Sequence, residues 1–310
     1  MNPNLRGLYA ILTASLTEDM ASIDTEDIRR QSEFCVLSGA HGIVAPVNAT
    51  EHSMLTFEER KTIVRHMVEQ VAGRIPTVVG VQGPCTEIAV AHAKYAKEFG
   101  ADAVIAMGPY ITQISDMEYL KNYFGAIADA CGLPVMLQNH DHAGQIPLTV
   151  AQVGELIKSV PAIQYVKEET PDSNHVIGAM TEQYKAFPDF KGVFGGKGSR
   201  FMIEEYYRGA CGNMPACDIP DLSAKLWNLL DAGKADEARD WFWKIYPVIE
   251  MEADYKFRLY KEVLAYRGIV KNTRWRTPGG TMDAHDRENF VAAMKKVEPY
   301  FTVHADDIKL

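Results

Sequence analysis

This sequence alternates eight times between a short run rich in β-branched residues and a longer segment whose apolar residues recur every three or four positions. The alternation constrains the fold more than any other feature, because a strand followed by a helix, repeated at spacings of roughly 20 to 35 residues, is typical of parallel βαβ units. Runs such as TVVGV and AVIAM are continuously apolar, as expected of parallel strands buried on both faces. The expected strands are residues 7–12, 42–47, 77–81, 103–107, 135–138, 163–167, 192–194 and 212–214.

Helix start and stop signals lie between these strands. Thr56, Thr86 and Thr149 are expected N-caps, because each hydroxyl can accept a hydrogen bond from the first turn of the helix that follows it. Helices are therefore expected to begin near these threonines, and a further helix is expected over residues 25–38. The glycines expected to end helices in a left-handed conformation are Gly39, Gly100, Gly132 and Gly209.

Eight parallel strands predict a (β/α)8 TIM barrel, which has no exposed sheet edges, and the alternative is a doubly wound open sheet. The residues after the eighth strand show helical patterns only, at 222–230, 235–266 and 287–297. We therefore expect a barrel over residues 1–220 and a helical extension over residues 221–310 packed on it.

The charge balance and the cysteines limit the function classes. The chain carries 32 Lys and Arg against 41 Asp and Glu, a net charge of −9, which disfavours nucleic-acid and membrane-surface partners. No apolar run approaches the roughly 20 residues of a membrane-spanning helix, and the N-terminal segment lacks the features of a signal peptide. The five cysteines are widely spaced and form no CxxC pair, so we expect reduced thiols, a cytoplasmic location and no metal site.

The end of the sixth expected strand carries the strongest catalytic signal. Lys167 closes the apolar run and would lie at the rim of the barrel, where active-site residues of this fold are found. An amine in apolar surroundings loses its proton more easily than one in water and can then attack a ketone to form a Schiff base. Glu169 shares a face with Lys167 on an extended chain and could transfer a proton beside the imine. A solvated lysine that merely ends a strand is the alternative.

Three other strand ends carry polar residues or glycines. The turn Asn48–Ala49–Thr50–Glu51 can bind a carboxylate through backbone N–H groups, or can simply lead into the next helix. The segment QNHDH after the fifth strand brings Gln138, Asn139, His140 and His142 to the barrel mouth, although surface histidines are the commoner explanation. Gly195 and Gly196 follow the seventh strand, where they allow a small acid to approach the backbone closely.

With these residues in order, the chain resembles the family of dihydrodipicolinate synthase and N-acetylneuraminate lyase, which are class I Schiff-base aldolases and lyases. The resemblance covers nearly the whole chain and rests on the segments GIVAPVNATEHSMLTFEER, GRIPTVVGV, GADAVIAMGPYI, LPVMLQN, YVKEE and GACGNMP. It implies a TIM barrel with C-terminal helices, a homotetramer or homodimer, and an imine between a 2-oxo acid and Lys167, with no separate cofactor.

The chain departs from the synthase pattern at several positions. Gln138 stands where the family has its catalytic tyrosine, and the arginine expected just beyond it is missing. The turn has lost both threonines at their usual places, and Ile111 replaces the second tyrosine of a Pro-Tyr-Tyr motif. The glutamine together with the Lys-Glu-Glu sequence is similar to the dehydratase branch, in particular to 2-keto-3-deoxyarabonate dehydratases.

The resemblance to this branch implies dehydration of a small anionic 2-keto-3-deoxy sugar acid to 2,5-dioxopentanoate, with Lys167 forming the imine and Glu169 removing a C3 proton. It also implies that the N–H groups of Asn48 and Ala49 hold the substrate carboxylate. The residues expected to line the rest of the pocket are Tyr110, Gln138, Asn139, Gly195 and Gly196. The alternatives are an aldolase or lyase that releases or condenses pyruvate, a pyrroline-carboxylate deaminase, and a non-catalytic 2-oxo acid sensor.

Overall fold

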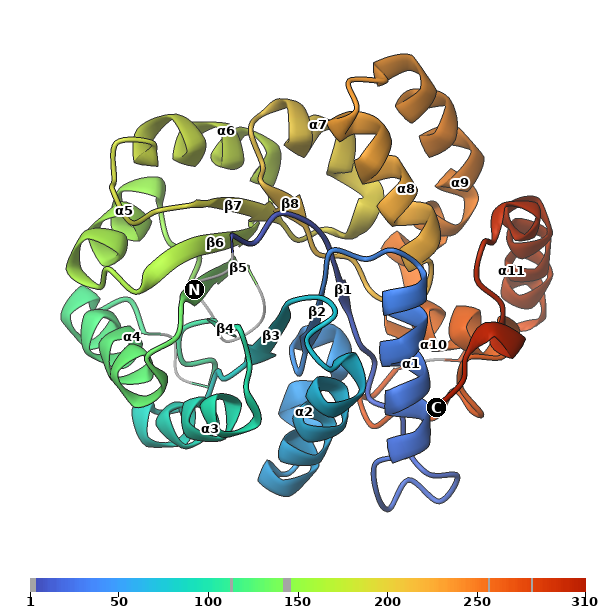
Figure 1. Cartoon of the computed structure of the whole chain (residues 1–310), viewed down its shortest axis with the longest axis horizontal. Helices are drawn as coiled ribbons and strands as arrows, with labels where there is room; N and C mark the ends of the chain where they lie inside the picture. The colour runs from blue at the N-terminus through green and yellow to red at the C-terminus, as the bar shows by residue number, and fades with distance from the viewer. Residues whose placement is uncertain (1–3, 112–113, 142–145, 256, 280) are drawn as a thin grey trace. The chain divides into compact units, whose positions relative to one another are not determined.

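The computed structural model describes residues 4–111, 114–141, 146–255, 257–279 and 281–310. Eight parallel strands form a closed barrel in the order β1 to β8 (Figure 1). The predicted TIM barrel is therefore confirmed, and the open doubly wound sheet is excluded. The strands are β1 Gly7–Ile11, β2 Gly42–Ala45, β3 Thr77–Gly80, β4 Ala103–Ala106, β5 Val135–His140, β6 Ile163–Glu169, β7 Gly192–Gly195 and β8 Gly212–Asn213.

Helices alternate with the strands and continue after the last of them. Those of the barrel repeat are α1 Thr25–Leu37, α2 Phe57–Val71, α3 Thr86–Phe99, α4 Met117–Cys131, α5 Val150–Ser159, α6 Ser173–Tyr184 and α7 Met202–Tyr207. The C-terminal helices are α8 Pro220–Asp231, α9 Ala235–Tyr255, α10 Phe257–Tyr266 and α11 Ala284–Val297. Short 3₁₀ helices include η1 Asn48–Thr50, η2 His52–Met54 and η3 Gly198–Phe201.

The predicted helix caps are confirmed at two of three positions. The Thr56 hydroxyl accepts the Glu59 N–H at 3.2 Å, and the Glu59 carboxylate accepts the Thr56 N–H at 2.9 Å, which completes a capping box at the start of α2. Thr149 caps α5 in the same way. Thr86 is not a cap but the first residue of α3, because Cys85 is the N-cap and its carbonyl accepts the Ala89 N–H.

Two strands run further than their apolar residues indicate. β5 continues to His140 and β6 to Glu169, and their register pairs Gln138 with Lys167 and His140 with Glu169. The prediction ended both strands two residues too early, because it stopped each one at the first polar residue after the apolar run, Gln138 in β5 and Lys167 in β6. The polar ends of β5 and β6 pair with each other, so they remain ordered as strands at the carboxyl end of the barrel.

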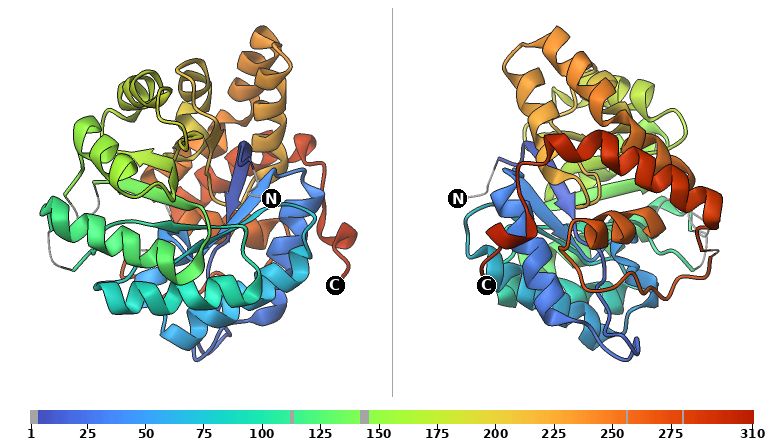
Figure 2. Two further views of the ribbon diagram at one scale, coloured as in Figure 1. Left: turned by 60° about the vertical axis from the view of Figure 1, so that its left-hand side comes forward. Right: turned by 90° about the vertical axis from the view of Figure 1, so that its right-hand side faces the viewer.

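The chain forms two compact units. The first contains residues 76–197 and 204–214 together with the described N-terminal residues up to Arg6, and it carries β3 to β8. The second contains residues 7–75, 198–203 and 215–310, and it carries β1, β2 and the C-terminal helices. Within the second unit α8 packs on β1, and α9 contacts both α8 and α11 (Figure 2). The boundary predicted at residue 220 coincides with the start of α8, and the division into barrel and extension stays a prediction.

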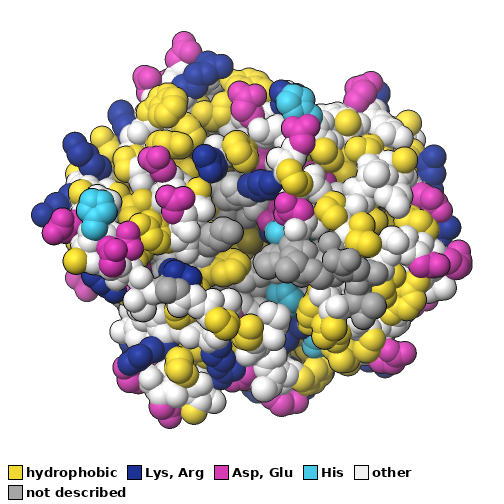
Figure 3. Space-filling view, turned by 180° about the vertical axis from the view of Figure 1, so that it is seen from behind, with side chains coloured by type: hydrophobic (Ala, Val, Ile, Leu, Met, Phe, Trp, Pro, Cys, Tyr) yellow, Lys and Arg dark blue, Asp and Glu magenta, His cyan; other side chains and the backbone are white. Residues whose placement is uncertain are grey.

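No helix in the described part of the chain is both long and apolar enough to cross a membrane. On the face of the molecule shown in Figure 3, acidic and basic side chains are interspersed.

Candidate active site

Lys167 lies inside the carboxyl end of β6, where its side chain is only 3% exposed. Its Nζ is 3.2 Å from Oε2 of Glu169, a carboxylate that is itself 9% exposed. The two side chains share a face because residues two apart in a strand point the same way, as the sequence predicted. The pair places an amine and a carboxylate in direct contact in surroundings that exclude most water.

Two side chains of the neighbouring strand β5 complete this cluster. Gln138 donates a hydrogen bond from Nε2 to Oε2 of Glu169, and the side chain is buried. Nε2 of His140 lies 3.9 Å from the other carboxylate oxygen, Oε1. The Glu169 carboxylate is therefore approached by nitrogen atoms of three side chains, and Gln138 and Lys167 hold the same oxygen.

Gly196, just after β7, forms one wall of the cluster. A Cβ atom added to it would lie 2.7 Å from Cε of Lys167 and 2.5 Å from Cδ of Glu169. The backbone of this residue therefore packs directly on both side chains, and only glycine leaves room for them. The predicted close approach of a small acid to the backbone at this position stays a prediction.

Gly195 does not face Lys167, contrary to the prediction that it lines the pocket. Its Cα lies against the carboxyl group of Glu205 on α7, so an added Cβ would meet Oε1 of Glu205 at 2.5 Å. The reason is the two-residue period of a strand: Gly195 pairs in register with Glu168, which points to the opposite side from Lys167.

Asn139 also points away from Lys167, although it lines a small pocket together with Gln138 and His140, so its predicted role in binding substrate stays a prediction. Its Nδ2 donates to Oε2 of Glu168 at 2.8 Å and to the Leu148 carbonyl at 3.0 Å, and its Oδ1 accepts the Leu148 N–H at 2.9 Å. Glu168 also accepts the Thr170 N–H at 2.7 Å, and burial raises the pKa of this carboxyl. These hydrogen bonds connect the end of β5 to the end of β6 on the side of the strands that faces away from Lys167.

Glu205 was not predicted as part of the site. It is fully buried, and its Oε2 accepts a hydrogen bond from Nδ2 of Asn213 at 2.6 Å. Burial raises the pKa of Glu205 to about 8, and the Glu169 carboxylate contributes in the same direction. The sequence signal that could have indicated its burial is helical spacing. Glu205 lies three residues after the buried Met202 and so shares its face of the helix.

Three other predicted site residues, Tyr110, Asn48 and Ala49, lie outside the strands. Tyr110 is half-buried in the segment that follows β4. Asn48 and Ala49 begin η1 in the second compact unit, where Oδ1 of Asn48 is 3.1 Å from Nε2 of His52. The first N–H groups of a helix have no partner within it, so those of Asn48 and Ala49 could bind a carboxylate. This predicted role stays a prediction. His142 lies outside the described residues.

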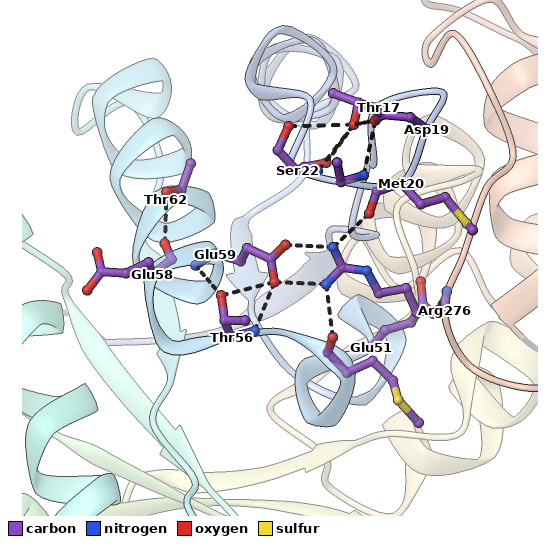
Figure 4. Close-up of polar contacts among 12 residues, drawn as sticks. Thr17, Asp19, Met20, Ser22, Glu51, Thr56, Glu58, Glu59, Thr62 and Arg276 are labelled. Atoms are coloured by element: carbon purple, nitrogen blue, oxygen red, sulfur yellow. Dashed lines mark hydrogen bonds and ion pairs between the residues drawn. The ribbon is translucent and has the colours of Figure 1, made fainter.

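Glu51, the last polar residue of this turn, has a structural role. Its carboxylate accepts the N–H groups of Arg276 and Thr277, both at 2.8 Å, and contacts Nζ of Lys261 at 2.7 Å. Burial disfavours its ionisation, but the Lys261 ammonium outweighs burial and holds the pKa of Glu51 below its usual value. Figure 4 shows that the Arg276 guanidinium reaches the Glu59 carboxylate of α2, with contacts of 2.6 and 2.8 Å.

Comparison with known proteins places this arrangement in a family. The model of the dihydrodipicolinate synthetase family matches residues 4–297. An L-2-keto-3-deoxyarabonate dehydratase of Azospirillum brasilense is 23% identical over 302 residues, which cover 96% of each protein. A 4-hydroxy-tetrahydrodipicolinate synthase of Bartonella henselae is 30% identical over 222 residues, which cover 71% of this chain and 74% of that protein.

Solved structures show the same fold. The 4-hydroxy-tetrahydrodipicolinate synthase of Methylacidiphilum fumariolicum SolV superposes with a TM-score of 0.86 at 24% identity, covering 95% of this chain and 96% of its own. Both the family model and the superposed structure match this chain over nearly its whole length, and the family model spans all eight strands. The chain therefore belongs to the dihydrodipicolinate synthetase family.

Proposed function

We propose that this protein is a Schiff-base-forming hydro-lyase that dehydrates a 2-keto-3-deoxy sugar acid of the 2-keto-3-deoxyarabonate type to 2,5-dioxopentanoate. The observation that carries the proposal is the contact of Lys167 with Glu169, with Gln138 on the same carboxylate oxygen. The dehydratase of Azospirillum brasilense supports the substrate class, since it aligns over almost the whole chain.

The proposed reaction begins at Lys167. Its neutral amine attacks the C2 ketone, and loss of water gives an iminium ion. Glu169 then removes a proton from C3, and the electron pair forms an enamine between C2 and C3. The imine is the electron sink of this chemistry, which calls for no separate cofactor.

Elimination follows from the enamine. The C4–O bond breaks, a double bond forms between C3 and C4, and the hydroxyl leaves as water after gaining a proton. The C5 alcohol then becomes an aldehyde in two proton shifts. C5 loses a proton as C3 gains one, which leaves an enol between C4 and C5, and the enol hydroxyl then loses its proton as C4 gains one. Hydrolysis of the imine frees Lys167 and releases 2,5-dioxopentanoate, which contains all five carbons of the substrate.

Gln138 favours dehydration over aldol cleavage. Breaking the C3–C4 bond of such a substrate requires removal of the proton from the C4 hydroxyl, which an amide does not accept as a base. In dehydration that hydroxyl gains a proton instead, and the amide has only to orient Glu169. The alternative is an aldolase or lyase, as the 4-hydroxy-tetrahydrodipicolinate synthase of Bartonella henselae illustrates for the family.

Product analysis tests the proposal. The enzyme is incubated with ¹³C-labelled 2-keto-3-deoxyarabonate of either configuration, and the products are followed by NMR, with Lys167→Ala as the inactive control. We expect one five-carbon dioxo acid. Release of pyruvate and a two-carbon aldehyde would show an aldolase and overturn the proposal.

A further inference from the structure

We propose that His140 is a second catalytic residue of this site, which protonates the C4 hydroxyl of the substrate as it leaves. The inference rests on the proposed dehydration and deepens it. Hydroxide is a poor leaving group, so the step that breaks the C4–O bond needs a proton donor in addition to the base that acts at C3.

The two carboxylate oxygens of Glu169 contact different side chains. Oε2 is held by Lys167 at 3.2 Å and by the amide of Gln138, whereas Oε1 faces Nε2 of His140 at 3.9 Å. The register of β5 and β6 places His140 beside Glu169 in the same way that it places Gln138 beside Lys167. His140 is therefore the next titratable group outward along the reacting face.

The order of these side chains matches the order of the substrate carbons. Exposure of the side chain rises from 3% at Lys167 to 9% at Glu169 and 18% at His140. A substrate bound through C2 to the innermost residue extends toward the mouth of the barrel. Its C3 then comes beside Glu169, and its C4 hydroxyl comes next, beside His140.

His140 and Glu169 together give and take the protons that the elimination requires. The His140 imidazolium gives the proton on Nε2 to the C4 oxygen as the enamine electron pair forms the bond between C3 and C4, and water departs. The proton that Glu169 took from C3 then passes from Oε1 to Nε2 when these two atoms, 3.9 Å apart here, come within hydrogen-bond distance, and both side chains are restored. Oδ1 of Asp141 lies 3.4 Å from Nδ1 of His140, so each ring nitrogen of His140 has a carboxylate near it.

His140→Gln tests this role by removing the acid while keeping a polar side chain. We expect dehydration to slow by about 10² to 10⁴, the usual effect of losing a general acid. Borohydride trapping of pyruvate at Lys167 and exchange of the pyruvate methyl protons in D₂O should continue at wild-type rates, because both precede the step that His140 serves. The matched control is His175→Gln, since His175 lies on α6 with its side chain 67% exposed.

A substrate with a different leaving group makes the test specific. The analogue with fluorine in place of the C4 hydroxyl expels fluoride without needing a proton, so His140→Gln should process it at close to the wild-type rate. An equal loss of rate on both substrates, a loss of methyl exchange, or unchanged dehydration would each overturn the role. A wild-type enzyme that exchanges methyl protons but eliminates neither group would contradict the proposed dehydration itself.

Discussion

At the scale of single residues, the carboxylate of Glu169 connects the reactive groups of β5 and β6. It receives Lys167 and Gln138 on one oxygen and faces His140 with the other. A carboxylate held in this way is oriented before substrate arrives, so it needs little reorganisation to take a proton from C3. In the proposed reaction Glu169 is thus a base whose position depends on three other side chains.

Glu169→Gln should separate imine formation from proton transfer. The variant keeps the size of the side chain but cannot accept the C3 proton, so turnover should fall by about 10² to 10⁴. Borohydride should still trap a pyruvate adduct on Lys167, which mass spectrometry of the digested protein detects. Turnover at the wild-type rate would assign the base to another residue.

Gly196→Ala should reduce activity without unfolding the protein. The added methyl group would lie 2.7 Å from Cε of Lys167 and 2.5 Å from Cδ of Glu169, so both side chains must shift. We expect kcat to fall by at least about tenfold, since small displacements of reacting groups are costly. Gly125→Ala is the matched control, because a Cβ at that helical position meets no atom within 4 Å. Equal kinetics of the two variants would contradict the packing described for Gly196.

At the scale of elements, the turn after β2 is fastened to the C-terminal helices. Glu51 pairs with Lys261 of α10, and both side chains are at most 4% exposed. A pair buried to this degree is costly to break from one side, because the remaining charge is left without its partner. The contact links η1 and η2 to α10 within the second compact unit.

Lys261→Met should therefore lower the free energy of unfolding by about 3 kcal/mol, measured from urea transitions. The reason is that Glu51 would keep its hydrogen bonds to Arg276 and Thr277 but lose its contact with the buried Lys261 ammonium. Lys234→Met is the control, since its pair with Glu237 is exposed on both sides and should contribute little. A loss equal to that of the control would show that the buried pair does not fasten the turn.

Sequence patterns predicted the elements better than their ends. The eight strands followed from apolar runs, and the shared face of Lys167 and Glu169 followed from the two-residue period. The ordered ends of β5 and β6 were missed because QNHDH and KEE are polar and resemble loops in isolation. The pairing of β6 with β5 shows that Asn139 faces away from Lys167, and its pairing with β7 shows the same for Gly195.

At the scale of the whole molecule, the buried carboxyl of Glu205 affects stability over a wide pH range. Its proximity to Asn213 and Gly195 depends on the packing of α7 against β7 and β8, so no local pattern predicts its surroundings. Burial raises its pKa to about 8 from an ordinary value of 4.5. Between these values the folded protein keeps a proton that the unfolded chain has lost.

Stability should consequently fall as the pH rises from about 5 to 8, by at most about 1.4 kcal/mol per pH unit from this group. Above pH 8 Glu205 is ionised in both states and adds no further slope. Glu205→Gln should flatten the wild-type profile in this window, whereas Glu204→Gln, at the exposed neighbour, should leave it unchanged. Parallel profiles of the wild type and Glu205→Gln, measured by urea unfolding at each pH, would contradict the effect.

The net charge of −9 has a second consequence for the whole molecule. An acidic protein does not draw an anionic 2-oxo acid through its overall field, so the attraction must be local. In the proposed reaction the amine of Lys167 supplies it by forming a covalent bond to the substrate. The proposed function thus depends on this one side chain more than on any other.

Borohydride trapping tests that dependence most directly. The protein is incubated with pyruvate, reduced with borohydride and digested, and the modified peptide is sequenced by mass spectrometry. We predict a stable adduct on Lys167 that is absent without pyruvate and absent from Lys167→Ala. An unmodified Lys167, with pyruvate or with any other 2-oxo acid, would contradict the Schiff-base chemistry on which the proposed function rests.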